Sequence, residues 1–169
     1  PIKNVVPESS SDFPMNIIIN TIPSKAAFTK MPAKTDVINY GKYLTNAGAC
    51  KECHTKFERG KLVEGTDFGG GREFPFPDGS MLRSGNITPD AATGIGGWNE
   101  AAFLAMFRVR SDSATLATKL KPGDFNSIMP WTMYGKMTDE DLKAIYAYLK
   151  TLTPINNAVV KFSPAKAKS

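Results

Sequence analysis

The chain has 169 residues, of which 41% are hydrophobic and 22% are charged, and it carries a net charge of +5. This composition predicts a folded chain and excludes one that is disordered throughout. No apolar run approaches the roughly 18 residues that a membrane helix needs. No dense block of Lys and Arg with interleaved aromatic residues occurs, which argues against nucleic-acid binding; the basic balance instead suits an acidic or membrane-bound protein partner.

Residues 1–34 are interrupted by prolines at positions 1, 7, 14, 23 and 32. Because proline lacks a backbone donor and fixes φ, this stretch predicts little regular structure. It still contains apolar residues that are able to pack. We expect a strap that lies over the domain, or a stalk from a membrane anchor. A chain that starts at Pro1 without Met fits a form from which a leader or an anchor was removed.

The first helix is predicted to start after Asp36, a favourable N-cap residue. Val37, Gly41, Leu44 and Gly48 follow at helical spacing and share one face. Glycine inside a helix lowers helix stability. We therefore expect another backbone or a bound ring to approach closely at Gly41.

Residues 55–97 contain many glycines and prolines and no helical period. A loop of this length without a core of its own is unusual in a compact domain. Packing against a large bound group would explain it. Residues 111–135 are also predicted as loop.

Two further helices follow from the apolar periodicity, one from Asn99 to about Arg110 and a last one after Thr138. Thr138 is the predicted N-cap of the last helix, and three acidic residues follow it at the positive end of the helix dipole. The helix that starts at Asn99 is predicted to bury Phe103, Met106 and Phe107. The last helix is predicted to bury Leu142, Ile145, Tyr146 and Leu149. With no convincing strand, the sequence predicts an all-α fold of three or more helices with long glycine- and proline-rich loops.

The sequence has two cysteines and one histidine, and they stand together as Cys50-Lys51-Glu52-Cys53-His54. C-x-x-C-H is the attachment signature of c-type haem, in which each thiol adds to a vinyl group and the imidazole projects toward the iron. A structural zinc site usually needs four Cys or His ligands, and a thioredoxin-type motif needs a βαβ context. A disulfide between the two cysteines would leave the adjoining histidine and the glycine-rich loop without a role. We therefore predict one covalently bound haem c.

The second axial ligand is predicted to be a methionine, because the chain has no second histidine. Met129 is preferred because it stands in a loop, directly before a proline and an aromatic residue. Met133 and Met137 are the alternatives. Met106 lies on a helical stripe, where a methionine is more often part of the core.

Several stretches resemble a known family. The stretch from Gly41 to His54 resembles class I bacterial cytochromes c. Other motifs resemble the cytochrome c subunit of membrane-associated alcohol and aldehyde dehydrogenases and its single-haem relatives. These motifs are Asn86-Ile87-Thr88-Pro89-Asp90, Thr93-Gly94-Ile95-Gly96 with Trp98, Met129-Pro130-Trp131 with Tyr134, Met137-Thr138-Asp139-Glu140-Asp141-Leu142 and Ala147-Tyr148-Leu149.

The resemblance spans roughly residues 36–152 and implies the class I cytochrome c fold wrapped around one haem. It implies His54 and Met129 as the axial ligands. It also implies that the first and last helices cross, with Tyr148 packed near Gly41.

Contacts to the rest of the haem are predicted from the residues that flank the glycine-rich loop. Arg83, Asn86, Trp98 and Trp131 are candidates to bind the propionates. A haem-ligating histidine normally donates its other ring N–H to a carbonyl or carboxylate. The carbonyl of Pro77 is one candidate for this role.

We divide the chain into a strap or stalk at 1–34, a cytochrome c domain at 35–155 and a C-terminal tail at 156–169. With both axial positions filled by side chains, we expect single-electron transfer between redox proteins and no catalysis. Haem attachment favours the periplasm or the outer face of the cytoplasmic membrane. The alternatives are a fixed electron-transfer subunit of a respiratory or dehydrogenase complex, or a haem enzyme or gas sensor with a labile sixth ligand.

Overall fold

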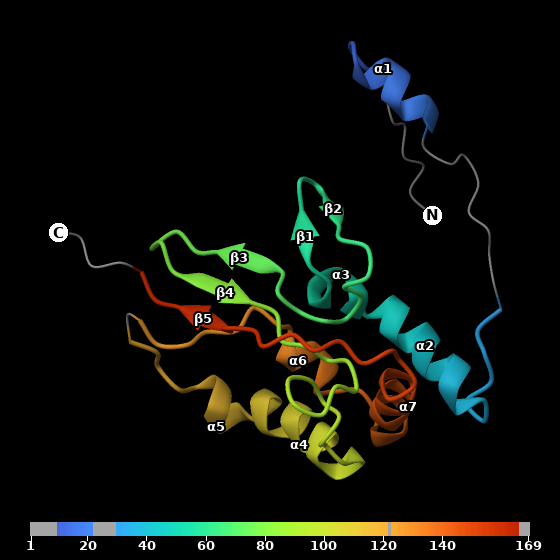
Figure 1. Ribbon diagram of the computed structural model, residues 1–169, viewed down its shortest axis with the longest axis vertical. Coiled ribbons are helices and arrows are strands. Elements are labelled where there is room, and N and C mark those ends of the chain that lie inside the picture. The colour runs from blue at the N-terminus through green and yellow to red at the C-terminus, as the bar shows by residue number, and fades with distance from the viewer. Residues whose placement is uncertain (1–9, 22–29, 122, 166–169) are drawn as a thin grey trace, which may run out of the picture. The chain divides into compact units, whose positions relative to one another are not determined.

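The computed structural model describes residues 10–21, 30–121 and 123–165 (Figure 1). The chain divides into two compact units, residues 1–30 and 31–169. In the first unit, helix α1 (Met15–Ile18) continues into the 3-10 turn η1 (Ile19–Thr21). The side chains of both elements are exposed. This part of the predicted strap or stalk is therefore a short helical segment with its apolar residues open to solvent.

The three long helices of the second unit lie where the sequence predicts them. They are α2 (Val37–Ala47), α4 (Glu100–Ser111) and α7 (Asp139–Leu149). Asp36, Asn99 and Thr138 cap them, each accepting a hydrogen bond from the backbone N–H three residues further on. No helix within the described ranges is long and apolar enough to cross a membrane.

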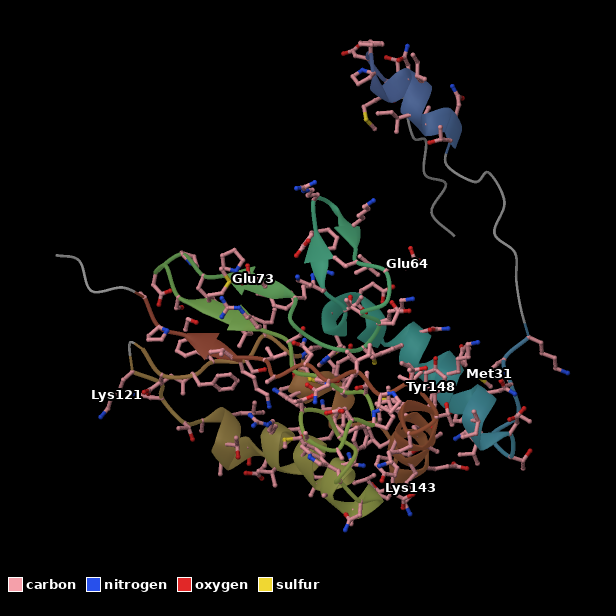
Figure 2. The ribbon with its side chains drawn as sticks, viewed as in Figure 1. Met31, Glu64, Glu73, Lys121, Lys143 and Tyr148 are labelled. Carbon is pink, nitrogen blue, oxygen red and sulfur yellow. The ribbon has the colours of Figure 1, made fainter. Side chains whose placement is uncertain are left out.

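Helices α2 and α7 cross at Gly41. A Cβ at this position would collide with the backbone oxygen of Ala144 and would lie 3.0 Å from the Cβ of Tyr148. Figure 2 labels Tyr148 at this crossing. The close approach predicted at Gly41, and its neighbour Tyr148, are confirmed.

The hydrophobic core lies between α4, α7 and the long loop. The two helices supply the buried residues that their apolar stripes predict, except that Met106 and Tyr146 are only partly buried and Met106 lines a cavity instead of joining the core. The loop adds one aromatic and one aliphatic side chain. The buried cluster consists of Phe68, Ile95, Phe103, Phe107, Leu142, Ile145 and Leu149. This core packs α4 against α7, and it contacts the long loop through Phe68 and Ile95.

The prediction that the chain forms no strands is wrong. Strand β1 (Phe57–Glu58) pairs with β2 (Lys61–Leu62), and β3 (Glu73–Pro75), β4 (Met81–Arg83) and β5 (Phe162–Ser163) form an antiparallel sheet in that order. Each strand has two or three residues, which is too short for an alternating pattern to be recognised in the sequence. The long loop is thus pinned by small sheets at its start and centre.

The segment 111–135 also contains more structure than predicted. It forms two single-turn helices, α5 (Ser113–Leu116) and α6 (Trp131–Tyr134). Each has four residues, less than the length over which helical periodicity becomes visible. Their turns hold the chain on either side of the stretch that leads to Met129.

Beyond α7 the chain continues as an extended segment, residues 154–165, which we call the C-terminal arm. It runs back beside the long loop and ends in β5 (Figure 1). The side-chain amide of Asn157 donates to the carbonyl of Gly69 at 2.9 Å, and the carbonyl of Lys161 accepts from the N–H of Arg83 at 2.7 Å. The arm is therefore held along its length by hydrogen bonds.

Candidate haem-binding site

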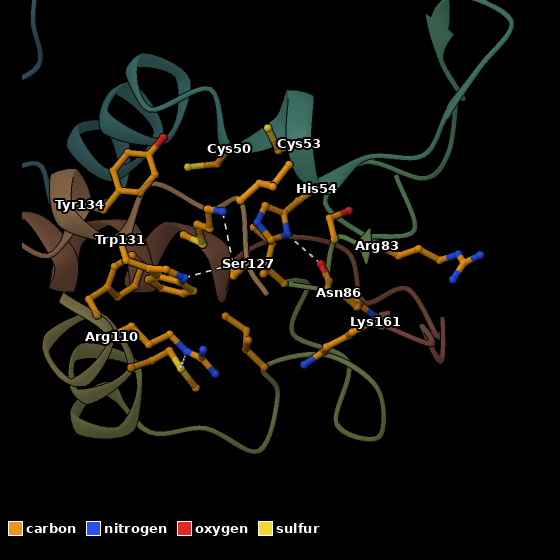
Figure 3. A pocket seen from close by; sticks show the side chains of 18 of the residues that line it. Cys50, Cys53, His54, Arg83, Asn86, Arg110, Ser127, Trp131, Tyr134 and Lys161 are labelled. Atoms are coloured by element: carbon orange, nitrogen blue, oxygen red, sulfur yellow. Dashed lines mark hydrogen bonds between the residues drawn. The ribbon is translucent and has the colours of Figure 1, made fainter. Parts of the chain in front are cut away.

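A cavity of about 280 Å³ lies between α3 (Cys50–His54), the long loop, α4 and the stretch before α6 (Figure 3). Most of its wall is apolar or aromatic. The structure brings together here the eight residues that the sequence predicts to attach, ligate or contact the haem by their side chains: Cys50, Cys53, His54, Arg83, Asn86, Trp98, Met129 and Trp131.

Helix α3 presents the attachment motif to this cavity. It starts directly after Ala49, whose left-handed backbone (φ 49°) turns the chain away from the end of α2. Residues three and four apart share one face of a helix, so Cys50, Cys53 and His54 point to the same side. Both cysteines are free thiols. Burial raises the pKa of the Cys50 thiol to about 11, so this thiol is protonated at neutral pH.

The imidazole of His54 is fixed by a backbone carbonyl. Its Nδ1 lies 2.7 Å from the oxygen of Gly85, and because a carbonyl can only accept, Nδ1 carries the proton. Nε2 is then left as the unprotonated nitrogen. Burial lowers the pKa of His54, the bond to Gly85 opposes this shift and the charge of Lys161 reinforces it. The prediction that Pro77 supplies this carbonyl is wrong.

Gly70 holds Gly85 in place. Gly70 has a left-handed backbone (φ +75°), and a Cβ there would lie 2.5 Å from the carbonyl carbon of Gly85. Its N–H donates to the oxygen of His54 at 2.6 Å. One glycine is therefore packed between the histidine and the carbonyl that orients it, and no larger residue fits.

Two methionines line the cavity, Met129 and Met106, whereas Met133 and Met137 are not among its lining residues. Met133 is 70% exposed and Met137 packs against the core. The sulfur of Met106 accepts a hydrogen bond from Nε of Arg110 at 3.0 Å.

The stretch before α6 is shaped around Ser127. Its hydroxyl accepts the backbone N–H of Met129 at 3.2 Å and the indole N–H of Trp131 at 3.1 Å. Trp131 also packs edge-on against Phe107 of the core, with ring centroids 5.6 Å apart. The backbone on both sides of the Met129 side chain is thus held in one conformation.

Arg83 and Asn86 border the cavity, but their polar groups are already hydrogen-bonded to other residues of the protein. The guanidinium of Arg83 bonds Glu73 at 2.8 Å and Ser163 at 3.0 Å, and Figure 3 shows it extending away from the cavity. The amide of Asn86 donates to the carbonyl of Ile155 at 2.6 Å and to Thr93 at 3.0 Å. In this structure both side chains hold the loop and the C-terminal arm together.

Two cationic residues that the sequence analysis did not single out also line the cavity, Arg110 and Lys161. No carboxylate side chain is found among the described residues of the lining. Arg110 had a recognisable signal, because it follows Phe103 by seven residues and so falls on the apolar stripe of α4. Lys161 had none, because it belongs to a segment predicted only as a tail.

These groups fit a haem. The apolar wall suits the porphyrin ring, and the cations suit its two carboxylates. Free thiols, an imidazole with a free Nε2 and a thioether are the groups by which a c-type haem is attached and ligated.

Comparison with known proteins agrees with this geometry. Residues 38–153 match the cytochrome c family, and the chain belongs to this family of haem-binding electron-transport proteins.

The chain is 35% identical over 132 residues to the gluconate 2-dehydrogenase cytochrome c subunit of Pantoea cypripedii. It is 34% identical over 118 residues to the cytochrome c subunit of the quinone-dependent alcohol dehydrogenase of Gluconacetobacter polyoxogenes, and 34% identical over 125 residues to the fructose dehydrogenase cytochrome subunit of Gluconobacter japonicus. These matches cover 78%, 69% and 73% of this chain but only 26%, 22% and 23% of the relatives. The resemblance to dehydrogenase cytochrome c subunits is thereby confirmed, for about a quarter of their length.

Proposed function

We propose that this chain binds one haem c covalently and passes single electrons between redox proteins on the outer side of the cytoplasmic membrane. The observation that carries the proposal is that Cys50, Cys53 and His54 share one face of α3 and open into the same apolar cavity as Met129.

Each side chain has a separate task in this proposal. The Cys50 and Cys53 thiols form thioether bonds, so the cofactor stays attached. His54 offers Nε2 to the iron, and its bond to Gly85 keeps the ring in one orientation. Met129 offers its thioether as the second axial ligand, which favours a high reduction potential. The haem supplies an iron that alternates between the ferric and ferrous states.

Electron transfer rather than catalysis follows from the same assignment. A substrate would have to displace an axial side chain to reach the iron. The chain contains no second histidine to serve as an acid or base in the cavity.

A second candidate is a fixed electron-transfer subunit of a membrane dehydrogenase. The printed names of the relatives favour it, because they are cytochrome subunits of gluconate, alcohol and fructose dehydrogenases. Both candidates use the same haem chemistry and differ in attachment. Purification of the protein from its native membrane under mild conditions separates them: a stable complex with a dehydrogenase supports the subunit, and release as a free protein supports the carrier.

The attachment is tested by expression with a haem-attachment system, followed by extraction with acidic acetone. We expect the colour to remain with the polypeptide at one haem per chain, and to be lost in the double variant Cys50→Ala/Cys53→Ala. If the haem of the wild-type protein extracts freely, or the protein is colourless, the proposal is wrong.

The Met129 ligand is tested by Met129→Ala, with Met133→Ala as the matched control at an exposed position. We expect Met129→Ala to abolish the weak long-wavelength band of sulfur-ligated ferric haem and to lower the reduction potential. Met133→Ala should leave both unchanged. A band that survives in Met129→Ala would move the assignment to another methionine.

A further inference from the structure

The C-terminal arm lies outside the matched region of the cytochrome c family, residues 38–153, and yet reaches the haem cavity. Hydrogen bonds from Asn157, and those accepted by the carbonyls of Ile155 and Lys161, fasten it to the long loop. Its last described part pairs as β5 with β4, where Phe162 lies opposite Leu82. The position of the arm is therefore well defined by the fold.

Lys161 brings a positive charge to the side of the cavity where His54 lies. Its Cε and Nζ lie 3.3 and 3.8 Å from the position that a Cβ on Gly85 would take, and Gly85 is the residue whose carbonyl orients His54. Figure 3 shows Lys161 reaching toward the cavity, while Arg83 extends away from it. Lys161 is an exposed residue, so salt partly screens its charge.

Phe162, the next residue, reaches the stretch that carries Met129. Its ring packs edge-on against Phe125, with centroids 6.0 Å apart and planes at 86°. Phe125 lines the cavity and stands four residues before Met129. Two consecutive residues of the arm therefore reach different parts of the cavity wall. Lys161 lies beside Gly85, and Phe162 packs on Phe125, four residues before Met129.

We propose that the C-terminal arm is an accessory wall of the haem site that tunes it from both axial sides: Lys161 supplies a fixed positive charge beside the His54–Gly85 bond, and Phe162 restrains the Met129 stretch through Phe125. Both are positioning residues, and the inference rests on the proposed function. A positive charge in the wall of the cavity favours the reduced state, because reduction removes one positive charge from the haem. Restraint of the Met129 stretch keeps the thioether on the iron when another ligand competes.

The charge is tested by equilibrium redox titration of the holoprotein at low salt. Lys161→Gln should lower the equilibrium constant for one-electron reduction by about threefold to tenfold, and the effect should shrink at high salt. Lys161→Arg keeps the charge and should behave like the wild type. The matched control is Lys143→Gln, which removes the same charge on α7, where Lys143 pairs with Glu100 at 3.2 Å.

The restraint is tested by titrating the ferric holoprotein with imidazole, which competes with Met129. Phe162→Ala should bind imidazole roughly fivefold more tightly, the effect expected for one lost aromatic pair. Phe125→Ala should give the same gain, and the double variant should add little to either. The matched control is Phe57→Ala, an exposed phenylalanine of β1 outside the cavity lining.

The two outcomes that would overturn the inference are distinct from failure of the proposed function. If Lys161→Gln titrates like Lys143→Gln, or if Phe162→Ala and Phe125→Ala bind imidazole like Phe57→Ala, the arm does not tune the site. Should Phe162→Ala yield too little holoprotein, Phe125→Ala decides the second point alone. If the wild-type protein holds no covalent haem, the proposed function itself is wrong.

Discussion

The α2–α7 crossing and the loop at residues 85–96 are held together by different forces. At the crossing, two helices pack through apolar side chains and one glycine that admits the neighbouring backbone. The loop has no helix, and its shape depends on side chains that bond backbone groups. Asn86, Asp90 and Thr93 accept backbone N–H groups, and the Asn86 amide also donates to the carbonyl of Ile155.

This difference determines which substitutions destabilise each region. Apolar packing depends on volume and responds to steric overlap. A buried hydrogen-bonded loop depends on particular donors and acceptors, and loss of one partner leaves the other unsatisfied. The following substitutions test this contrast.

Gly41→Val should have the largest effect. Its side chain would collide with the backbone of Ala144 and force α2 away from α7. We expect a loss of about 3 kcal/mol in the free energy of unfolding, measured by denaturant titration of the holoprotein. Gly97→Ala is the control, because the nearest atom to its added Cβ is 4.0 Å away. A Gly41→Val protein as stable as the control would contradict the account of the crossing.

Asn86→Ala should come next. Asn86 is 7% exposed, and its side chain bonds the backbone N–H of Thr88 and the carbonyl of Ile155 at 2.9 and 2.6 Å. Loss of these partners should lower the free energy of unfolding by about 2 kcal/mol. Asn46→Ala, at an exposed position of α2, serves as the control. Equal stability of the two variants would show that the loop does not depend on this amide.

We expect the contribution of Asp90 to the free energy of unfolding to depend on pH. Hydrogen bonds from the hydroxyl and the backbone N–H of Thr93 hold the pKa of Asp90 below its ordinary value of 3.8. The carboxylate therefore stabilises the folded state fully above pH 3.8, and this contribution is lost as the pH falls through the lower pKa of the folded state.

The measurement is the free energy of unfolding of the wild type and of Asp90→Asn, from neutral to acidic pH. Because asparagine does not titrate, the advantage of the wild type should be constant near neutrality and should shrink below pH 3.8. An advantage that stays constant in acid would rule out this role for the carboxylate.

Lys34→Met should have the smallest effect. Lys34 and Glu140 form an ion pair at 3.1 Å in which both side chains are largely exposed. Such pairs contribute about 0.5 kcal/mol or less, and the difference from the wild type should fall further at high salt. If Lys34→Met lowered the free energy of unfolding as much as Asn86→Ala, the pair would contribute more stability than exposed ion pairs usually do.

The long helices could be predicted because each has several turns of apolar periodicity and a recognisable cap. Gly41 also carried information, since a glycine inside a helix indicates close approach. The cavity-lining cysteines and His54 were found through their spacing, which the chemistry of haem attachment requires. These features are local in the sequence, and local patterns are what periodicity and motifs report.

The remaining features depend on contacts between distant segments. The strands are two or three residues long, and β5 pairs with a strand about eighty residues earlier. Arg83 and Asn86 were predicted to face the propionates, yet their polar groups bond partners that only the folded arm brings near. The arm itself, and with it Lys161, had no periodicity that could place it beside the cavity.

The bond between His54 and Gly85 has a genetic consequence. Its acceptor is a backbone oxygen, which every amino acid possesses, so no replacement of the side chain at position 85 removes it. An alanine scan of the cavity would therefore pass over the group that orients His54, the proposed iron ligand. The vulnerable position is Gly70, where any side chain would press against the Gly85 backbone. Mutations that misalign His54 should accordingly be found at a residue that touches neither the imidazole ring nor the haem iron.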